Sequence, residues 1–399
     1  MRISTNQLYR QSIDTIIDRQ NRLSDLDEKI ASGKKLINPS DDPVGAVRVI
    51  GMTAELAAYE QYARNIDLAR AQISQEETAL AQAGDTMQRV RELIVQANNA
   101  TLNDSNRHAI ATEIDSLNDE LMALANTKDA TGEYLFGGFQ ADTAPFSRNA
   151  GVVQYNGDQG QRLVRIGTTA QVASRDNGFS VFQQIPTGNG TFAMDASNSN
   201  AGNAVMSGSV SGTFVPDTYT IEFIQATPTD PVTYEVRDSS AALVTSGDYS
   251  DGDTIDFAGA QMRFKGTPAD GDTFTVETST NRDIFSSIDD IVALLDNPAP
   301  DSPNEARLHT RLNEALQTID SAMGHFLDVR AELGVRLNRL DNQEDVNEGA
   351  TLQVKKSISA VEDLDYGEAI NELNTQLFAL EAAQQTYVRI TQLSIFNYL

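Results

Sequence analysis

The chain has 399 residues, 40% of them apolar, so it is long enough for two or three domains with their own hydrophobic cores. Its 30 lysines and arginines stand against 57 aspartates and glutamates, and the net charge of -27 disfavours nucleic acid and anionic membranes as partners. Cysteine is absent, which excludes disulfides, thiolate metal sites and cysteine nucleophiles and suits a chain that is exported unfolded. We expect no membrane span and no cleaved secretory signal, because no long apolar run occurs.

An amphipathic helix is predicted for roughly residues 4–30. Its apolar side chains recur at steps of three and four residues, with polar interruptions at Gln20 and Asp27. These apolar positions form the N-terminal seam: Tyr9, Ile13, Ile16, Leu23 and Ile30. Gly33 follows as a predicted helix stop.

A turn of six residues, the NPSDDP turn, comes next: Asn38, Pro39, Ser40, Asp41, Asp42 and Pro43. Asp42 is a predicted N-cap and Pro43 the first residue of the helix that follows. Apolar residues then keep helical spacing, without proline, from Val44 to about Ala100, which predicts a rod of roughly 85 Å. A further helix after Asn103 is expected to fold back along this rod.

The stretch from about Gln140 to Thr280 is rich in glycine, serine, threonine and aspartate, and its apolar residues alternate, as at Tyr219, Ile221 and Phe223. This pattern predicts a mostly antiparallel β domain. Asp-Gly-Asp occurs at residues 251–253 and 270–272, where it signals hairpin turns. Calcium binding is a second hypothesis for these turns, but they lack the further ligands of an EF-hand loop, so ordinary turn chemistry is favoured.

Helical periodicity returns after Arg282. A capping box at residues 302–305 opens a second rod, which runs to about Leu340 and is the expected packing partner of the first. The last helix carries the C-terminal seam: Tyr366, Ile370, Leu373, Leu377, Leu380 and Tyr387. One pair of such narrow stripes buries little surface, so both terminal helices are expected to become ordered when copies of the chain associate.

The predicted fold class is mainly α with an inserted antiparallel β domain, in which the two ends of the chain form a long helical coiled-coil bundle. Residues 1–43 and 350–399 are assigned to a terminal coiled-coil domain. Residues 44–139 and 281–349 are assigned to a helical rod domain, and residues 140–280 to an outer β domain.

No residues converge on a catalytic, cofactor-binding or metal site. His108, His309 and His325 lie in separate helical stretches, without a second ligand three or four residues away, so solvent-facing or helix-terminal histidines are expected. Neither a nucleophile elbow nor a phosphate-binding glycine loop occurs. An enzyme carried on helical arms is an alternative from a different class, which the sequence disfavours.

Three stretches resemble the bacterial flagellin superfamily. The first is ASGKKLINPSDDPVGA at residues 31–46, whose Asp41-Asp42-Pro43 form is similar to the hook-associated branch. The second is GEYLFGG at residues 132–138, and the third runs from Asp365 to Leu399. The resemblance leaves the β insertion unmatched.

This resemblance implies a structural subunit that associates with its own copies in a helical assembly, in the zone between hook and filament of an extracellular bacterial flagellum. It implies export through the flagellar type III apparatus, with an export chaperone on the C-terminal helix. The implied partners are a hook-associated protein 1 type junction protein and flagellin. Within the same class, a minor flagellin that forms the filament itself is the alternative.

Overall fold

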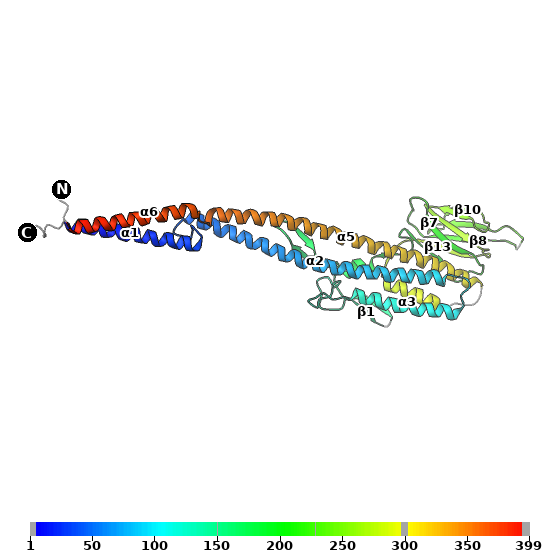
Figure 1. Ribbon diagram of the computed structural model, residues 1–399. Coiled ribbons are helices and arrows are strands. Elements are labelled where there is room, and N and C mark those ends of the chain that lie inside the picture. Colours follow the sequence, from blue (N-terminus) through cyan, green and yellow to red (C-terminus); the bar gives the residue numbers. More distant parts are fainter. Residues whose placement is uncertain (1–4, 150, 228, 297–301, 393–399) are drawn as a thin grey trace, which may run out of the picture. The chain divides into compact units, whose positions relative to one another are not determined.

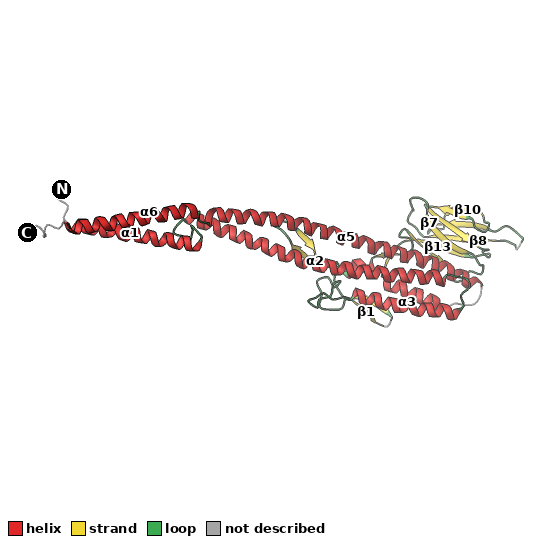
Figure 2. Cartoon of the chain, in the orientation of Figure 1, coloured by secondary structure: helices red, strands yellow, loops and turns green. Residues whose placement is uncertain are grey.

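The structure, a computed structural model, describes residues 5–149, 151–227, 229–296 and 302–392 (Figure 1, Figure 2). The helices are α1 (Thr5–Ser32), α2 (Pro43–Ala97), α3 (Asp104–Ala125), α4 (Ile284–Asp296), α5 (Ser302–Glu362) and α6 (Tyr366–Gln392). The chain divides into two compact units, of which the first combines residues up to Arg64 with residues from Asn342 on. The second unit runs from Asn65 to Asp341.

The strands all lie between α3 and α4. They are β1 (Phe146–Asn149), β2 (Val152–Tyr155), β3 (Leu163–Arg165), β4 (Gln171–Ala173), β5 (Ile185–Pro186), β6 (Phe192–Ala196), β7 (Val205–Val210), β8 (Tyr219–Ile224), β9 (Thr233–Arg237), β10 (Leu243–Asp248), β11 (Thr254–Phe257), β12 (Ala260–Lys265), β13 (Thr273–Thr278) and β14 (Asn281–Arg282). A π-helical turn occupies Phe179–Gln183. All strand pairs are antiparallel, so the expected fold class, mainly α with an inserted antiparallel β domain, is confirmed.

In the first unit, α1 and α6 run antiparallel, side by side (Figure 1). The rings of Tyr9 and Tyr387 meet edge to face at one end of the pair, with centroids 6.3 Å apart. At the other end the backbone N–H of Leu364 donates to the carbonyl of Gly33 at 3.0 Å. Each helix covers one narrow stripe of its surface against the other, because its apolar residues recur every three or four positions.

In the second unit, α2 and α5 run antiparallel, as predicted for the two rods. Arg330 pairs with Glu77 at 2.7 Å, and Arg91 pairs with Asp320 at 2.6 Å. Residues later in α2 therefore contact residues earlier in α5, as in an antiparallel pair. The fully buried stripe between them includes Ile66, Ile73, Leu80, Met87, Leu312, Ile319 and Leu333. Helix α3, capped by the side chain of Asn103, packs on α4 and contributes to the same core.

A separate core belongs to strands β6–β13. A five-stranded sheet of order β10-β9-β8-β13-β6 and a three-stranded sheet of order β11-β12-β7 bury aromatic and aliphatic side chains together. Tyr219, Ile221 and Phe223 of β8 all point into this core, as their alternation predicted. Phe223, Phe264 and Phe274 meet at its centre, with ring centroids 5.0–5.9 Å apart.

The β core starts later in the chain than the boundary at residue 140 that was expected from composition. Phe146 and Phe182 belong to the helical core, where the ring of Phe182 lies 5.8 Å from Phe285 on α4 and 5.6 Å from Phe326 on α5. The short strands β1–β5 therefore belong with the helices, and the second core begins at Phe192. The polar composition of residues 140–186 concealed this, because each strand contributes only one or two apolar residues.

Candidate assembly surface

The NPSDDP turn uses its two aspartates in opposite directions. The Asp41 carboxylate accepts from the backbone N–H of Asn38 at 3.1 Å and closes the turn behind it. The Asp42 carboxylate accepts from the N–H groups of Val44 and Gly45 at 3.1 and 3.0 Å, ahead of it. Asp42 is therefore the N-cap of α2 and Pro43 its first residue, as predicted.

At two glycines the backbone lies so close to neighbouring side chains that a Cβ atom would not fit. A Cβ atom at Gly45 would lie 2.5 Å from Oδ2 of Asp42 and 2.9 Å from a methyl group of Leu36, so a larger residue would displace the cap. Gly33 ends α1 in the left-handed region, with φ +71, and a Cβ atom there would lie 2.8 Å from the hydroxyl of Tyr366. The predicted helix stop at Gly33 is confirmed.

A backbone bridge joins the end of α1 to the end of α5. The N–H of Lys35 donates to the carbonyl of Glu362 at 2.8 Å, next to the bond between Leu364 and Gly33. The ammonium of Lys34 pairs with the Glu362 carboxylate at 2.5 Å, and this hydrogen bond, followed by the charge of Glu362, raises the pKa of Lys34. Because the ammonium is exposed, the ion pair stabilises the contact between the ends of α1 and α5 less than the backbone hydrogen bonds do.

The N-terminal seam does not lie on one face of α1. The covered positions of α1 follow steps of three and four residues at Tyr9, Ser12, Ile16, Arg19, Leu23, Leu26 and Ile30. Ile13 is exposed instead, and Arg19 and Leu26 take the places that the prediction gave to Gln20 and Asp27. The sequence offers overlapping stripes through Ile13, Ile16 and Ile17, and only the contact with α6 selects between them.

The C-terminal seam divides in the same way. The covered positions of α6 include Ala369, Leu373, Gln376, Leu380, Ala383 and Tyr387. Three predicted residues are among them, whereas Tyr366, Ile370 and Leu377 are exposed. The family-like stretch continues to Leu399, but its last seven residues lie outside the described residues.

Large apolar side chains face solvent on these two helices, and we call them the outer apolar face: Ile13, Ile17, Ile370, Leu377, Phe378 and Val388. Phe378 is 75% exposed and Leu377 43%. Ile17, Phe378 and Val388 are not among the predicted seam residues, although each lies one position beyond one of them, at Ile16, Leu377 and Tyr387. Single exposed apolar residues are ordinary on protein surfaces. An antiparallel pair of helices that displays several of them has a surface suited to another protein chain.

The first turns of α2 display a second exposed apolar group. Val44, Val47 and Ile50 are 68–71% exposed and follow each other at three-residue steps, so they share one side of the helix. The sequence prediction had counted this part of α2 as rod and missed its exposure.

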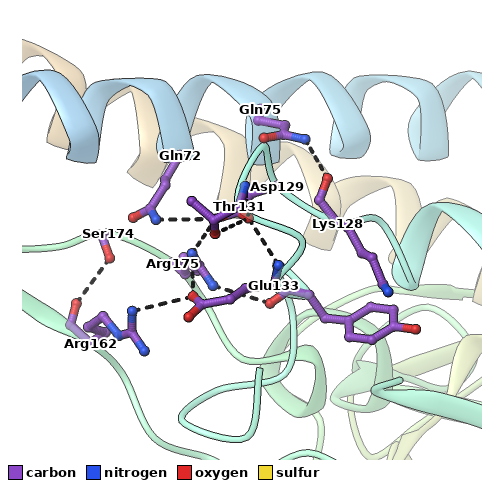
Figure 3. A network of polar contacts seen from close by, with 10 residues as sticks. Gln72, Gln75, Lys128, Asp129, Thr131, Glu133, Arg162, Ser174 and Arg175 are labelled. Carbon is purple, nitrogen blue, oxygen red and sulfur yellow. Dashed lines mark hydrogen bonds and ion pairs between the residues drawn. The ribbon is translucent and has the colours of Figure 1, made fainter. Parts of the chain in front are cut away.

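The GEYLFGG segment is anchored in the second unit. Leu135 and Phe136 are fully buried in the helical core. Figure 3 shows the polar network beside them, in which Arg175 pairs with Asp129 at 2.5 Å and with Glu133 at 2.9 Å. Burial alone would raise the pKa of Asp129, but the hydrogen bonds from Thr131 and Glu133 outweigh it and lower that pKa. The network holds the segment against α2, from which Gln72 and Gln75 reach it.

The two Asp-Gly-Asp turns use their carboxylates on the backbone. Asp251 accepts from Gly266, Asp253 from Ser250 and Asp270 from Gln225, at 2.7–2.8 Å. Asp272 accepts from the N–H of Ala201 at 2.7 Å. The bond between Asp253 and Ser250 closes its own turn, whereas the other three join the turns to distant segments of the chain.

The three histidines have separate partners. His108 is exposed and contacts Asp296, whereas His309 contacts Asn98 and His325 contacts the carbonyl of Ser180. His309 and His325 are half-buried, so the expectation that they face solvent is wrong for both. Across the described ranges, no three or more His, Cys, Asp or Glu residues are grouped to hold a metal ion. Within the same residues, no helix is long and apolar enough to cross a membrane.

Comparison with known proteins covers both ends of the chain. The bacterial flagellin N-terminal helical region matches residues 3–141, and the bacterial flagellin C-terminal helical region matches residues 316–399. Flagellar hook-associated protein 3 of Escherichia coli K12 is 27% identical over 398 residues, which cover 100% of this chain and 99% of that protein.

Solved structures are similar over most of the chain. FlgL of Xanthomonas campestris shares 37% sequence identity with a TM-score of 0.71, over 77% of this chain and 99% of that one. The flagellar junction protein FlgL of Legionella pneumophila shares 33% identity with a TM-score of 0.72, over 79% of this chain and 100% of that one. By contrast, a flagellin of Escherichia coli O127:H6 matches over 119 residues, 30% of this chain and 22% of that protein.

Proposed function

The chain belongs to the bacterial flagellin family, and from this we propose that it is the structural subunit that joins the hook to the filament of a bacterial flagellum. One observation carries the proposal: the similarity to flagellar hook-associated protein 3 runs from end to end of both chains. A flagellin matches over only 30% of this chain and 22% of its own length, which favours the junction over the filament. The function is mechanical and needs no catalytic residue.

The first unit supplies the surfaces for self-association. The covered seam residues hold α1 and α6 together within one chain, and the outer apolar face is left for neighbouring copies in a helical assembly. Covering one Leu or Phe side chain contributes roughly 1.5–3 kcal/mol. Several such side chains per subunit, repeated through the assembly, are enough to drive association. Ile13, Ile370 and Leu377 of the predicted seams therefore act between chains, and Tyr9, Leu23 and Leu380 within one.

The partners follow from the position in the flagellum. A hook-associated protein 1 type junction protein lies on the hook side, and flagellin on the filament side. Transport through the flagellar type III apparatus, with an export chaperone on α6, fits a chain that has no cysteine to form disulfides outside the cell.

A minor flagellin is the second candidate, and the number of copies per flagellum separates the two. We expect a strain that lacks this chain to make hooks without attached filaments and to release flagellin into the medium. Immuno-electron microscopy of the complemented strain should place the chain in one thin zone between hook and filament. Label along the filament, or filaments that persist in its absence, would overturn the proposal.

A further inference from the structure

Glu76, in the middle of α2, carries a carboxyl group that is enclosed in the helical core of the second unit. Its side chain is 0% exposed, and Ile73 and Leu80, one turn to either side, are fully buried as well. Both carboxyl oxygens face one donor, the backbone N–H of Asp176, at 3.2 and 3.3 Å. Asp176 belongs to a short segment, residues 174–178, that crosses the rod between β4 and the π-helical turn.

The cations around Glu76 are committed to other carboxylates. Arg336 of α5 binds both oxygens of Asp176 at 2.9 Å and approaches Glu332 at 3.5 Å. Arg175 binds Asp129 and Glu133, and Arg162 approaches Glu133 at 3.4 Å. In the part of the chain that the structure describes, no ion pair within 4.0 Å is formed by Glu76 itself.

These surroundings favour the neutral form of the carboxyl. Burial, followed by the charge of Asp176, raises the pKa of Glu76 well above its ordinary range. Arg336, the hydrogen bond from the Asp176 backbone and Arg175 act in the opposite direction, but they do not offset these two effects. An ionised Glu76 would add a second negative charge near that of Asp176 in the dry interior.

We propose that Glu76 is a proton-dependent latch that holds residues 174–178 between α2 and α5 and releases them when its carboxyl ionises. The protonated carboxyl accepts the Asp176 N–H and adds no charge to the core. Loss of the proton leaves a buried negative charge, which makes the packed arrangement unfavourable. This cost is removed when residues 174–178 leave α2 and water reaches the carboxylate. Opening of the rod therefore releases one proton and becomes easier as the pH rises.

The sign of the linkage is fixed by the raised pKa. The stability that the neutral carboxyl contributes is fully present below the pKa of an unfolded glutamate, and it is lost as the pH rises through the pKa of the folded state. The same chain is thus harder to unfold in acidic surroundings than in alkaline ones, as far as this group is concerned.

Equilibrium unfolding of the full chain tests the latch by comparing wild type with Glu76→Gln from pH 5 to pH 9. The amide keeps the acceptor and cannot ionise. The unfolding constant of the wild type relative to that of the variant should rise by up to about tenfold per pH unit while the folded carboxyl keeps its proton and the unfolded one has lost it, and should level off once the folded carboxyl ionises. Glu60→Gln, at an exposed position of the same helix, controls for the removal of one negative charge. A wild-type to Glu76→Gln ratio that stays constant across this range would overturn the latch.

Amide exchange in the wild-type chain gives a test that does not depend on the variant. The N–H groups of Ser174, Asp176 and Gly178 are all hydrogen-bonded, to Arg162, Glu76 and Phe136. After correction for the intrinsic effect of pH, their protection should fall selectively as the pH rises, while that of α3 stays constant. Protection that changes in parallel in both segments would overturn the proposal, whether or not Glu76→Gln folds.

Discussion

The hydroxyl of Thr310 on α5 accepts a hydrogen bond from the backbone N–H of Met206 on β7, at 3.1 Å. One turn further along α5, the amide of Asn313 donates to the Met206 carbonyl at 3.2 Å, and Gln317 follows by donating to the carbonyl of Gly208 at 2.7 Å. These side chains occupy backbone groups at the outer edge of β7, where another strand would otherwise pair. The β core is thus fastened to the rod by polar bonds, while its apolar residues form a core of their own.

The first prediction concerns removal of that β core. Thr187 and Thr280 are neighbours, because the N–H of Thr187 donates to the carbonyl of Thr280 at 2.9 Å. Deleting residues 188–279 and joining these two by a short glycine linker should leave the helical melting transition intact. Circular dichroism of the purified chain measures it. A longer deletion from residue 142 to 281 should abolish the transition, because it removes Phe146 and Phe182 from the helical core. Equal behaviour of the two deletions would contradict the division of the cores.

The second prediction separates folding from assembly. Leu377 lies on the outer apolar face and is exposed in the single chain, so Leu377→Asp should change the free energy of unfolding by less than about 0.5 kcal/mol. In cells the same change should leave hooks without filaments, because the charge would be buried between copies. Electron microscopy and thermal melting give the two readings.

Leu312→Asp is the matched change inside the rod. Leu312 is fully buried within one chain, and aspartate there should lower the free energy of unfolding by at least about 3 kcal/mol. If Leu377→Asp lowered the melting temperature as much as Leu312→Asp, the outer face would have to be covered within the monomer.

The third prediction compares a glycine with positive φ, Gly33, with a glycine inside a helix, Gly51, both in the first unit. Gly33→Ala should cost roughly 1–2 kcal/mol, because the left-handed conformation is unfavourable for alanine and the new methyl group meets Tyr366. Gly51→Ala should stabilise α2 by roughly 0.5–1 kcal/mol, since nothing lies within 4 Å of the added atom. Urea unfolding followed by circular dichroism measures both. The same sign for both changes would refute the account of Gly33.

The fourth prediction concerns acid. His309 is half-buried beside Asn98, and burial, followed by the charge of Arg107, lowers its pKa from the ordinary value of 6.5, although Glu305 opposes this. A histidine whose folded pKa is lowered supports stability above its unfolded pKa and loses that stability as the pH falls toward the folded value. Between pH 7 and pH 5 the wild-type chain should therefore lose more stability than His309→Gln. Parallel melting curves of the two chains over this interval would exclude a role for His309.

Local signals in the sequence predicted local structure well. Asp42 caps α2 and Gly33 ends α1 because each depends on a few neighbouring residues and its own backbone conformation. The side of α1 that meets α6 could not be predicted in the same way. Leu26 and Ile13 are both apolar and both fit a helical stripe, and the choice between them depends on α6, which lies more than three hundred positions further along the chain. The place of Phe182 in the helical core is likewise set by distant partners on α4 and α5.

The contact between Tyr9 and Tyr387 determines when, during folding, the first unit can form. A chain that is made or delivered from its amino end exposes α1 first and α6 last, so α1 waits for its partner until nearly all other residues have arrived. The second unit can collapse earlier, because its helices lie between these two segments. The pairing that closes the first unit joins residues that are far apart along the sequence, and such contacts form late. A chain cut short before α6 would keep α1 unpaired, so only a complete chain can present both helices of the outer apolar face.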